Sequence, residues 1–188
     1  MLHAPAPYGP AHGFLELASI ARGIVVCDAL VKKAPVRLLL TEPVTPGKYL
    51  VLFDGGEAEV DEAFRAGLEV AKDALVDRLM LPHPHDELWQ GLAGTLVRPP
   101  LDSIAVVEAR SVAGTLAACD AALKAAEVRL FQLQLARGIG GKGWFALTGT
   151  LAQIESAAEA ASRALGEGLL AGLEIVPRPH DDLAGTAL

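Results

Sequence analysis

The chain of 188 residues is poor in charged, aromatic and cysteine residues. Charged residues make up 21% and aromatic residues 5% of it, and acidic residues outnumber basic ones to give a net charge of −7. That balance leaves no basic surface for nucleic acid or anionic lipid. No apolar run approaches the ~18 residues of a membrane-spanning helix, and Met1–Gly13 lacks the basic and apolar regions of a secretory signal. These absences predict a cytoplasmic protein that binds neither nucleic acid nor membranes.

The two cysteines, Cys27 and Cys119, are expected on the apolar sides of two helices. A free cysteine there behaves as a small apolar side chain. Neither cysteine has a second one at the spacing of a metal or cluster ligand. We therefore expect no disulfide between them, no metal site and no cofactor.

Apolar residues are abundant by contrast. They make up 52% of the chain, chiefly Ala, Val and Leu, and the mean hydropathy is +0.36. A small domain with this much apolar surface usually buries part of it against a partner chain. The composition therefore predicts an oligomer.

The chain also contains an internal repeat. Residues 16–42 align with residues 108–134 at an offset of 92, and eleven of these 27 positions are identical. Residues 46–48 align with 140–142 at an offset of 94, and residues 81–88 with 176–183 at an offset of 95. A period this long with two copies indicates a duplicated domain rather than a solenoid. Two like domains in one chain favour a closed ring with twice as many domains as chains.

The repeat divides the chain into two domains of similar size. We expect a first domain over residues 14–90, a linker over 91–102 that contains Pro99 and Pro100, and a second domain over 103–183. Residues 1–13, with three prolines, are expected to form a flexible arm, and residues 184–188 a tail.

Each copy is predicted to contain the elements β-α-β-β-α-β, an α+β arrangement. In the first copy we expect strands at 14–18, 36–41 and 49–53, a helix at 20–34 with Cys27, Leu30 and Val31 inward, and a last strand from Met80. A helix is also predicted over 61–79, because apolar residues recur there every three or four positions. The second copy is expected to have strands at 104–108, 128–135, 144–148 and 174–176 and helices at 112–126 and 151–165.

Three motifs give the second copy a family resemblance. Glu108-Ala109-Arg110-Ser111, the helix Ala118–Ala126 and the closing Val176-Pro177-Arg178-Pro179-His180 resemble the bacterial microcompartment shell domain. The first copy matches less literally, through 16–19, 27–34 and 81–85. Two such domains resemble the tandem-domain, trimer-forming class, in the unpermuted order of a ferredoxin-like variant. The resemblance implies a structural protein rather than an enzyme.

The resemblance places four residues at the edge of a shell tile. Lys32 and Lys124 occupy the family's edge-lysine position, where the stem can pack while the ammonium reaches a neighbour's carbonyls. Arg178 matches the arginine of the closing motif, and His83 replaces it in the first copy. Alternate edges of a pseudohexamer are therefore expected to differ. The alternative is that these are ordinary solvated residues.

The resemblance also predicts pore-lining turns between the second and third strands of each copy. Glycines allow backbones to crowd a symmetry axis, and their N–H groups can face a small polar solute. The alternatives are an ordinary hairpin turn and, for the two lysines, a position on a concave face rather than at the opening. The predicted pore residues are Thr45, Pro46, Gly47, Lys48, Ile139, Gly140, Gly141 and Lys142.

Two other sequence patterns resemble a nucleotide-binding motif and a metal-binding cluster, but their contexts argue against both functions. Gly138, Gly140 and Gly143 have the spacing of a dinucleotide fingerprint, but a strand is expected after them where the fingerprint needs a helix. His83, His85 and Asp86 cluster in the sequence, but the intervening proline holds the histidines extended and facing apart. We expect neither a nucleotide site nor a metal site.

Two functions of different classes follow. The favoured one is a shell protein whose trimers tile facets around encapsulated enzymes, contact other shell proteins at their edges and pass small metabolites through a central pore. The alternative is an oligomeric ligand-binding or regulatory protein with duplicated ferredoxin-like domains, since a fold alone does not fix a function.

Overall fold

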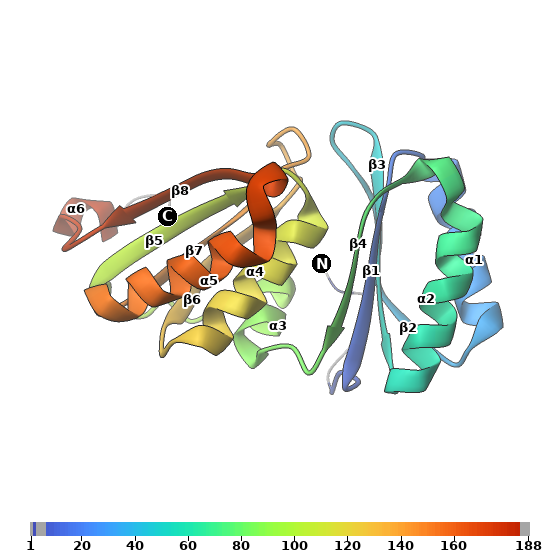
Figure 1. Ribbon diagram of the computed structural model, residues 1–188, viewed down its shortest axis with the longest axis horizontal. Coiled ribbons are helices and arrows are strands. Elements are labelled where there is room, and N and C mark those ends of the chain that lie inside the picture. The colour runs from blue at the N-terminus through green and yellow to red at the C-terminus, as the bar shows by residue number, and fades with distance from the viewer. Residues whose placement is uncertain (1, 3–6, 185–188) are drawn as a thin grey trace. The chain divides into compact units, whose positions relative to one another are not determined.

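The computed structural model describes residue 2 and residues 7–184. The chain divides into two compact units (Figure 1). The first comprises residues 1–84 together with the loop 136–141, and the second comprises residues 85–135 and 142–188.

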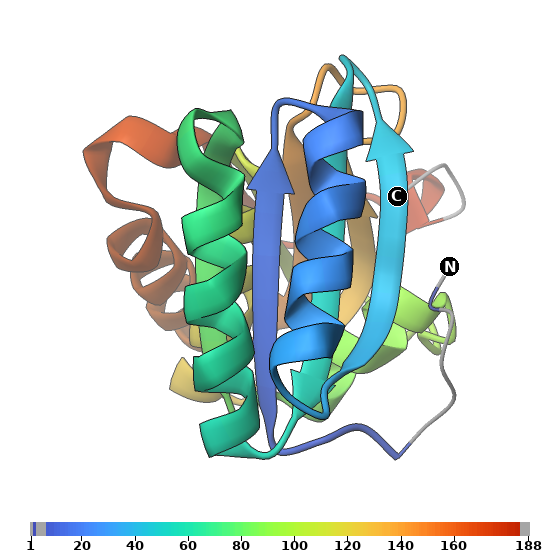
Figure 2. The same cartoon turned by 90° about the vertical axis from the view of Figure 1, so that its right-hand side faces the viewer.

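The first unit is a four-stranded antiparallel sheet with two helices on one face. Its strands are β1 (Ala11–Leu17), β2 (Arg37–Val44), β3 (Lys48–Gly55) and β4 (Leu75–Pro82), in the spatial order β2-β3-β1-β4. Helices α1 (Ile20–Lys33) and α2 (Glu57–Ala71) lie side by side against the sheet (Figure 2), and a 3-10 turn, η1 (Lys72–Ala74), leads into β4. The opposite face of the sheet carries the polar side chains described below.

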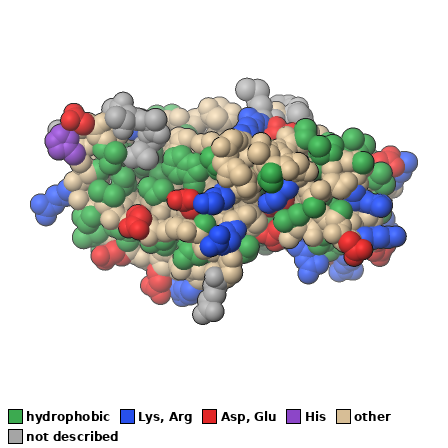
Figure 3. All heavy atoms as spheres, turned by 90° about the horizontal axis from the view of Figure 1, so that it is seen from above, with side chains coloured by type: hydrophobic (Ala, Val, Ile, Leu, Met, Phe, Trp, Pro, Cys, Tyr) green, Lys and Arg blue, Asp and Glu red, His purple; other side chains and the backbone are tan. Residues whose placement is uncertain are grey.

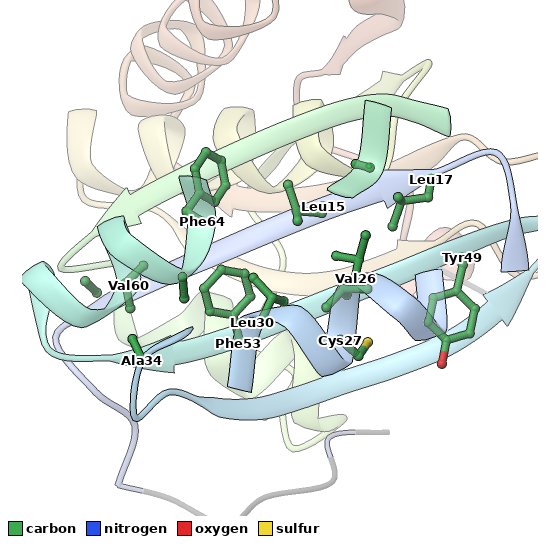
Figure 4. Close-up of a cluster of buried hydrophobic side chains, with 14 residues drawn as sticks. Leu15, Leu17, Val26, Cys27, Leu30, Ala34, Tyr49, Phe53, Val60 and Phe64 are labelled. Carbon is green, nitrogen blue, oxygen red and sulfur yellow. The ribbon is translucent and has the colours of Figure 1, made fainter. Parts of the chain in front are cut away.

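Alternation along the strands builds the core of this unit. Leu15 and Leu17 of β1 and Phe53 of β3 point to the helices, where they meet Leu30 of α1 and Phe64 of α2 (Figure 4). Successive strand residues point to opposite faces, so Glu16, between the two leucines, points away from the helices. One sheet face therefore holds the apolar core, and the other can hold charged groups.

The second unit repeats this arrangement. Strands β5 (Ser103–Ala109), β6 (Arg129–Leu135), β7 (Gly143–Gly149) and β8 (Leu170–Val176) form an antiparallel sheet in the order β6-β7-β5-β8, and helices α4 (Val112–Ala125) and α5 (Leu151–Leu169) pack on it. Helices α3 (Asp86–Ala93) and α6 (Asp181–Ala184) follow the two β-α-β-β-α-β cores. The predicted α+β class and the order of elements are confirmed.

The duplication extends to local backbone detail. Ser19 and Ser111 both cap the first helix of their unit, by accepting hydrogen bonds from the backbone N–H of Arg22 and Gly114. A serine oxygen at this position satisfies a backbone donor that has no partner within the helix. His83 and Arg178, at equivalent positions after the last strands, share a left-handed backbone with φ of 45° and 50°. The two copies thus fold by the same local rules.

One predicted helix was wrong in its length. The helix expected over 61–79 ends at Ala71, and Leu75 already belongs to β4. In β4 half-buried and exposed residues alternate strictly, which is the period of a strand. Leu75 and Leu79 satisfy both the helical and the strand spacing, and Lys72, with a φ of 48°, ends the helix before them.

Three smaller expectations also differ from the structure. Val31 is 45% exposed, and Val26 takes the buried place beside Cys27 and Leu30. Helix α5 runs to Leu169 across a non-helical residue, Gly166, so β8 begins at Leu170. Part of the expected flexible arm is ordered, because β1 begins at Ala11 and the Gly9 N–H donates to Asp54. The rest of that arm, residue 1 and residues 3–6, and residues 185–188 of the tail lie outside the described residues.

Helix α3 was not predicted, and it belongs to the second unit although residues 85–90 were assigned to the first domain. The Glu87 carboxylate explains this placement, since it accepts hydrogen bonds from the Arg129 side chain and the Leu130 backbone N–H of edge strand β6. The His85 backbone N–H donates to Asp120 of α4 at 2.7 Å. The residues after β4 therefore anchor on the next repeat.

Candidate functional site

The two predicted edge lysines lie in the last turns of equivalent helices, α1 and α4. Lys32 Nζ is 2.6 Å from the Asp28 carboxylate, and Lys124 Nζ is 2.6 Å from that of Asp120. Lysine four residues after an aspartate lies one turn away on the same helix face. Each ammonium is thereby paired with a carboxylate one turn earlier on its own helix, a pairing that sequence reasoning about Asp28 and Asp120 had missed.

The other two predicted edge residues lie at the ends of β4 and β8. His83 and Arg178 are both exposed, and His83 Nε2 lies 3.1 Å from the Glu57 carboxylate at the start of α2. The structure therefore places the four predicted edge residues at two kinds of position, a helix end and a strand end, in each repeat.

The predicted pore residues lie in the hairpin loops of the two sheets. Thr45, Pro46 and Gly47 form an exposed turn between β2 and β3, and Lys48 is the first residue of β3. Ile139, Gly140, Gly141 and Lys142 lie in the β6–β7 loop. Gly47, Gly140 and Gly141 have positive φ values, a conformation that glycine adopts without steric cost.

Residues of the two loops meet within the first compact unit. The Gly141 carbonyl lies 3.5 Å from Lys48 Nζ, and a Cβ at Gly141 would come within 3.0 Å of Pro46 Cδ. Arg137 of the second loop forms an ion pair at 2.7 Å with Glu42 of β2. Sequence reasoning missed Glu42 and Arg137, because they differ in type and position between the repeats. An open hollow of about 530 Å³ is lined by Pro43, Val44, Thr45, Pro46, Gly47, Arg137 and Gly138.

Both lysines of the loops are paired with glutamates. Lys48 Nζ lies 2.6 Å from Glu16 Oε1 of β1, and Lys142 Nζ lies 3.5 Å from Glu108 Oε2 of β5. Glu16 and Glu108 are repeat equivalents, and their identity in the alignment was the available signal for this role. The pairing reduces the positive charge that either lysine presents to an anion.

A charged cluster lies on the helix-free face of the first sheet. Asp54 is buried and accepts two hydrogen bonds from the Arg37 guanidinium. Burial acts to raise the pKa of Asp54, but the Arg37 and Gly9 hydrogen bonds and the Arg37 charge outweigh it and lower that pKa. Burial lowers the pKa of nearby His12 to about 4. His12 is therefore neutral at pH 7 beside an ionised Asp54.

The described residues offer no group of three or more His, Cys, Asp or Glu side chains that could hold a metal ion. Cys27 and Cys119 are buried, and burial raises the pKa of Cys27 to about 11 and that of Cys119 well above its usual value. Both thiols are thus protonated at neutral pH, and a thiolate is the form that ligates a metal. No described helix is long and apolar enough to cross a bilayer.

The duplicated fold matches a known domain family. The model of the BMC domain matches the chain twice, over residues 11–84 and 103–179. The chain belongs to the BMC domain family. Both matches begin at or next to the first strand of a unit and end in the segment after its last strand, so each unit is one BMC domain in unpermuted order.

Similar proteins have the same tandem organisation or half of it. The chain is 37% identical to the bacterial microcompartment shell protein PduT of Citrobacter freundii over 92% of this chain and 95% of that protein. It is 36% identical to the carboxysome shell protein CsoS1C of Hydrogenovibrio crunogenus, over 46% of this chain and 87% of that one. A solved microcompartment protein from Desulfitobacterium hafniense DCB superposes with a TM-score of 0.82 at 35% identity, over 94% of this chain and 98% of that one. This BMC protein is therefore a bacterial microcompartment shell protein, as its motifs predicted.

Proposed function

We propose that three chains of this BMC protein close into a ring of six domains, a pseudohexamer, that tiles the facets of a microcompartment shell. The role is structural and not enzymatic, and its place is the shell of a microcompartment in the cytoplasm. The observation that carries this proposal is a difference in exposure between equivalent helices.

Helix α1 exposes an apolar stripe that its equivalent, α4, buries. Ile20, Ile24 and Val31 are 42%, 58% and 45% exposed, and their equivalents are 0%, 2% and 4% exposed: Val112, Leu116 and Leu123. Figure 3 shows apolar side chains among charged ones on one face of the single chain. The apolar side chains of α4 are covered within one chain. In a ring, a neighbouring chain would cover the equivalent side chains of α1, so both helices would bury the same face.

The edges of such a ring would carry Lys32, Lys124, His83 and Arg178. Asp28 and Asp120 pair with the two lysines in the same way in both repeats, so both ammonium groups present equivalent donors to carbonyls of a neighbouring tile. His83 and Arg178 differ in shape and in the number of hydrogen-bond donors that they present, so alternate edges suit different neighbours, either copies of this protein or other shell proteins.

The hairpin loops would surround the central pore with threefold symmetry, because the two copies differ there. Glu16 and Glu108 pair with Lys48 and Lys142, so lysine charge contributes little to selectivity. The glycine backbones at 140 and 141 supply N–H groups instead, and Gly47, whose N–H donates to the Val44 carbonyl, supplies width. We propose that small polar metabolites pass by size and by hydrogen bonding to the loop backbone.

Negative-stain electron microscopy of the purified protein tests the tiling directly. Flat sheets with a hexagonal lattice are expected, alone or after mixing with a single-domain shell protein. Discrete particles that never join into sheets under either condition would instead favour an oligomeric ligand-binding or regulatory protein.

A further inference from the structure

The two repeats end in the same capped turn. His85 Nδ1 accepts a hydrogen bond from the Glu87 N–H at 3.2 Å, and His180 Nδ1 accepts one from the Asp182 N–H at 3.2 Å. The Leu88 and Leu183 N–H groups donate to the carbonyls of the same histidines at 3.0 Å and 2.9 Å. Residues 180–183 therefore already have the backbone shape of residues 85–88.

The turn at 85–88 is docked on the repeat that follows it. His85 donates its backbone N–H to Asp120, and Glu87 accepts from the Leu130 backbone N–H at 2.6 Å. Glu87 is buried in this contact, whereas the equivalent Asp182 has a side chain that is 93% exposed. The turn at residues 180–183 thus has the same backbone hydrogen bonds as the turn at 85–88, but its acidic side chain is not buried against another element.

The first repeat carries the matching receptor groups. Asp28 and Leu38 are the equivalents of Asp120 and Leu130 in the repeat alignment. One oxygen of Asp28 binds Lys32. Within residues 7–184 no backbone N–H donates to Asp28, and no side chain accepts from the Leu38 N–H.

One receptor residue differs between the repeats. Arg129 pairs with Glu87, but its equivalent Arg37 is already paired with Asp54, where the second repeat has Thr148. The Arg37 guanidinium also donates to the Pro7 carbonyl. The contacts that remain for a docking segment in the first repeat are therefore those of Asp28 and Leu38.

We propose that residues 180–183 of one chain dock on the first BMC domain of the next chain. In this contact the His180 backbone N–H donates to Asp28, and the Asp182 carboxylate accepts from the Leu38 backbone N–H. The same head-to-tail contact, made three times between chains and three times within them, closes the ring. This inference rests on the proposed trimer and assigns its contact residues.

Disulfide crosslinking tests the contact with two exposed positions, in the variant Asp28→Cys/His180→Cys. The native cysteines are buried with raised pKa values, so they compete little for oxidation. After mild oxidation, a non-reducing gel should show covalent dimers and trimers, up to about 59 kDa for three chains of 19.6 kDa. Each single variant should give no trimer band. The matched double variant His85→Cys/Asp120→Cys should crosslink within one chain and run on the gel at the mass of a single chain.

Light scattering of the unoxidised proteins distinguishes a failure of the docking contact from a failure of the proposed trimer. A trimeric mass for the Asp28→Cys/His180→Cys variant without any interchain crosslink would overturn the docking contact and leave the ring standing. A wild-type protein with the mass of one chain would overturn both. Crosslinked trimers from a trimeric variant support both.

Discussion

Glu16 and Lys48 form a buried ion pair on the helix-free face of the first sheet, and their repeat equivalents form an exposed one. The Glu16 side chain is 0% exposed and lies 2.6 Å from Lys48 Nζ. Glu108 and Lys142 are about half exposed and lie 3.5 Å apart. The same pair of residue types therefore sits in two environments within one chain, which provides a matched comparison.

Glu16→Gln should destabilise the protein by about 3 kcal/mol, because it leaves the Lys48 ammonium mostly buried without its counter-charge. Glu108→Gln should cost less than about 1 kcal/mol, since exposed ion pairs contribute little. Urea unfolding followed by circular dichroism measures both. Equal losses in the two variants would show that the burial of Glu16 is not what makes the pair matter.

Glu87→Ala should loosen α3 from the second domain and lower the free energy of unfolding by about 2–4 kcal/mol. The change removes the acceptor of the Leu130 N–H and the partner of Arg129, and it leaves a buried donor unsatisfied. Asp86→Ala, at the exposed neighbouring position, is the control and should cost less than about 1 kcal/mol. Hydrogen exchange should rise at Leu130 in the first variant only; unchanged protection there would contradict the anchoring role.

Exchanging both Lys32 and Lys124 for Ala should leave the trimer intact and abolish or strongly reduce flat sheets. The reason is that both lysines are predicted at tile edges, and the proposed contact between chains uses the Asp28 carboxylate and the Leu38 N–H rather than either ammonium group. Electron microscopy counts the sheets, and light scattering checks the trimer. Lys33→Ala, an exposed lysine one position further along the same helix, is the control and should form sheets like the wild type. Normal sheets from the double variant would refute the edge assignment.

The stability of the protein should fall as the pH drops from about 6.5 towards 4. His12 has a folded-state pKa of about 4, below the 6.5 of an exposed histidine. Between these values the unfolded chain binds a proton that the folded chain does not, so acid favours unfolding. From pH 7 to pH 4.5 the loss should approach about 2 kcal/mol.

Replacing His12 by Asn isolates this effect from the carboxylates. The variant should show a flatter stability profile between pH 6.5 and 4, measured as the urea midpoint at each pH. Loss of the Asp54 contribution belongs to a lower pH range, because its lowered pKa keeps this carboxylate charged at a pH where an exposed aspartate is already being protonated. A variant profile as steep as that of the wild type would show that His12 is not the titrating group.

The repeat made most of the fold predictable, because identical residues at a constant offset fix equivalent elements in both copies. The prediction of β4 failed because its apolar spacing fits both a helix and a strand. Leu75 and Leu79 are four positions apart, as on one helix face, but they belong to β4. Helix α3 was not predicted for another reason. Its position depends on contacts between Glu87 and residues more than forty positions away, and no local pattern encodes such contacts.

Candidate sites were predicted as positions but not as interactions. The motifs located Lys32, Lys124 and the loop lysines, yet none of them indicated that Asp28, Asp120, Glu16 and Glu108 hold these four side chains. The Asp–Lys pairs could have been read from the four-residue spacing within a helix. The Glu–Lys pairs join a strand to the start of the strand paired with it, and the register of those strands was needed to find them.

The central claim is that three chains form one closed ring, and the solution mass of the purified protein tests it most directly. Multi-angle light scattering at modest salt should give about 59 kDa, three times the chain mass of 19.6 kDa. Twice that mass would indicate two stacked rings and keep the claim. A mass of one or two chains would contradict it, because with two domains per chain neither assembly contains the six domains of the ring.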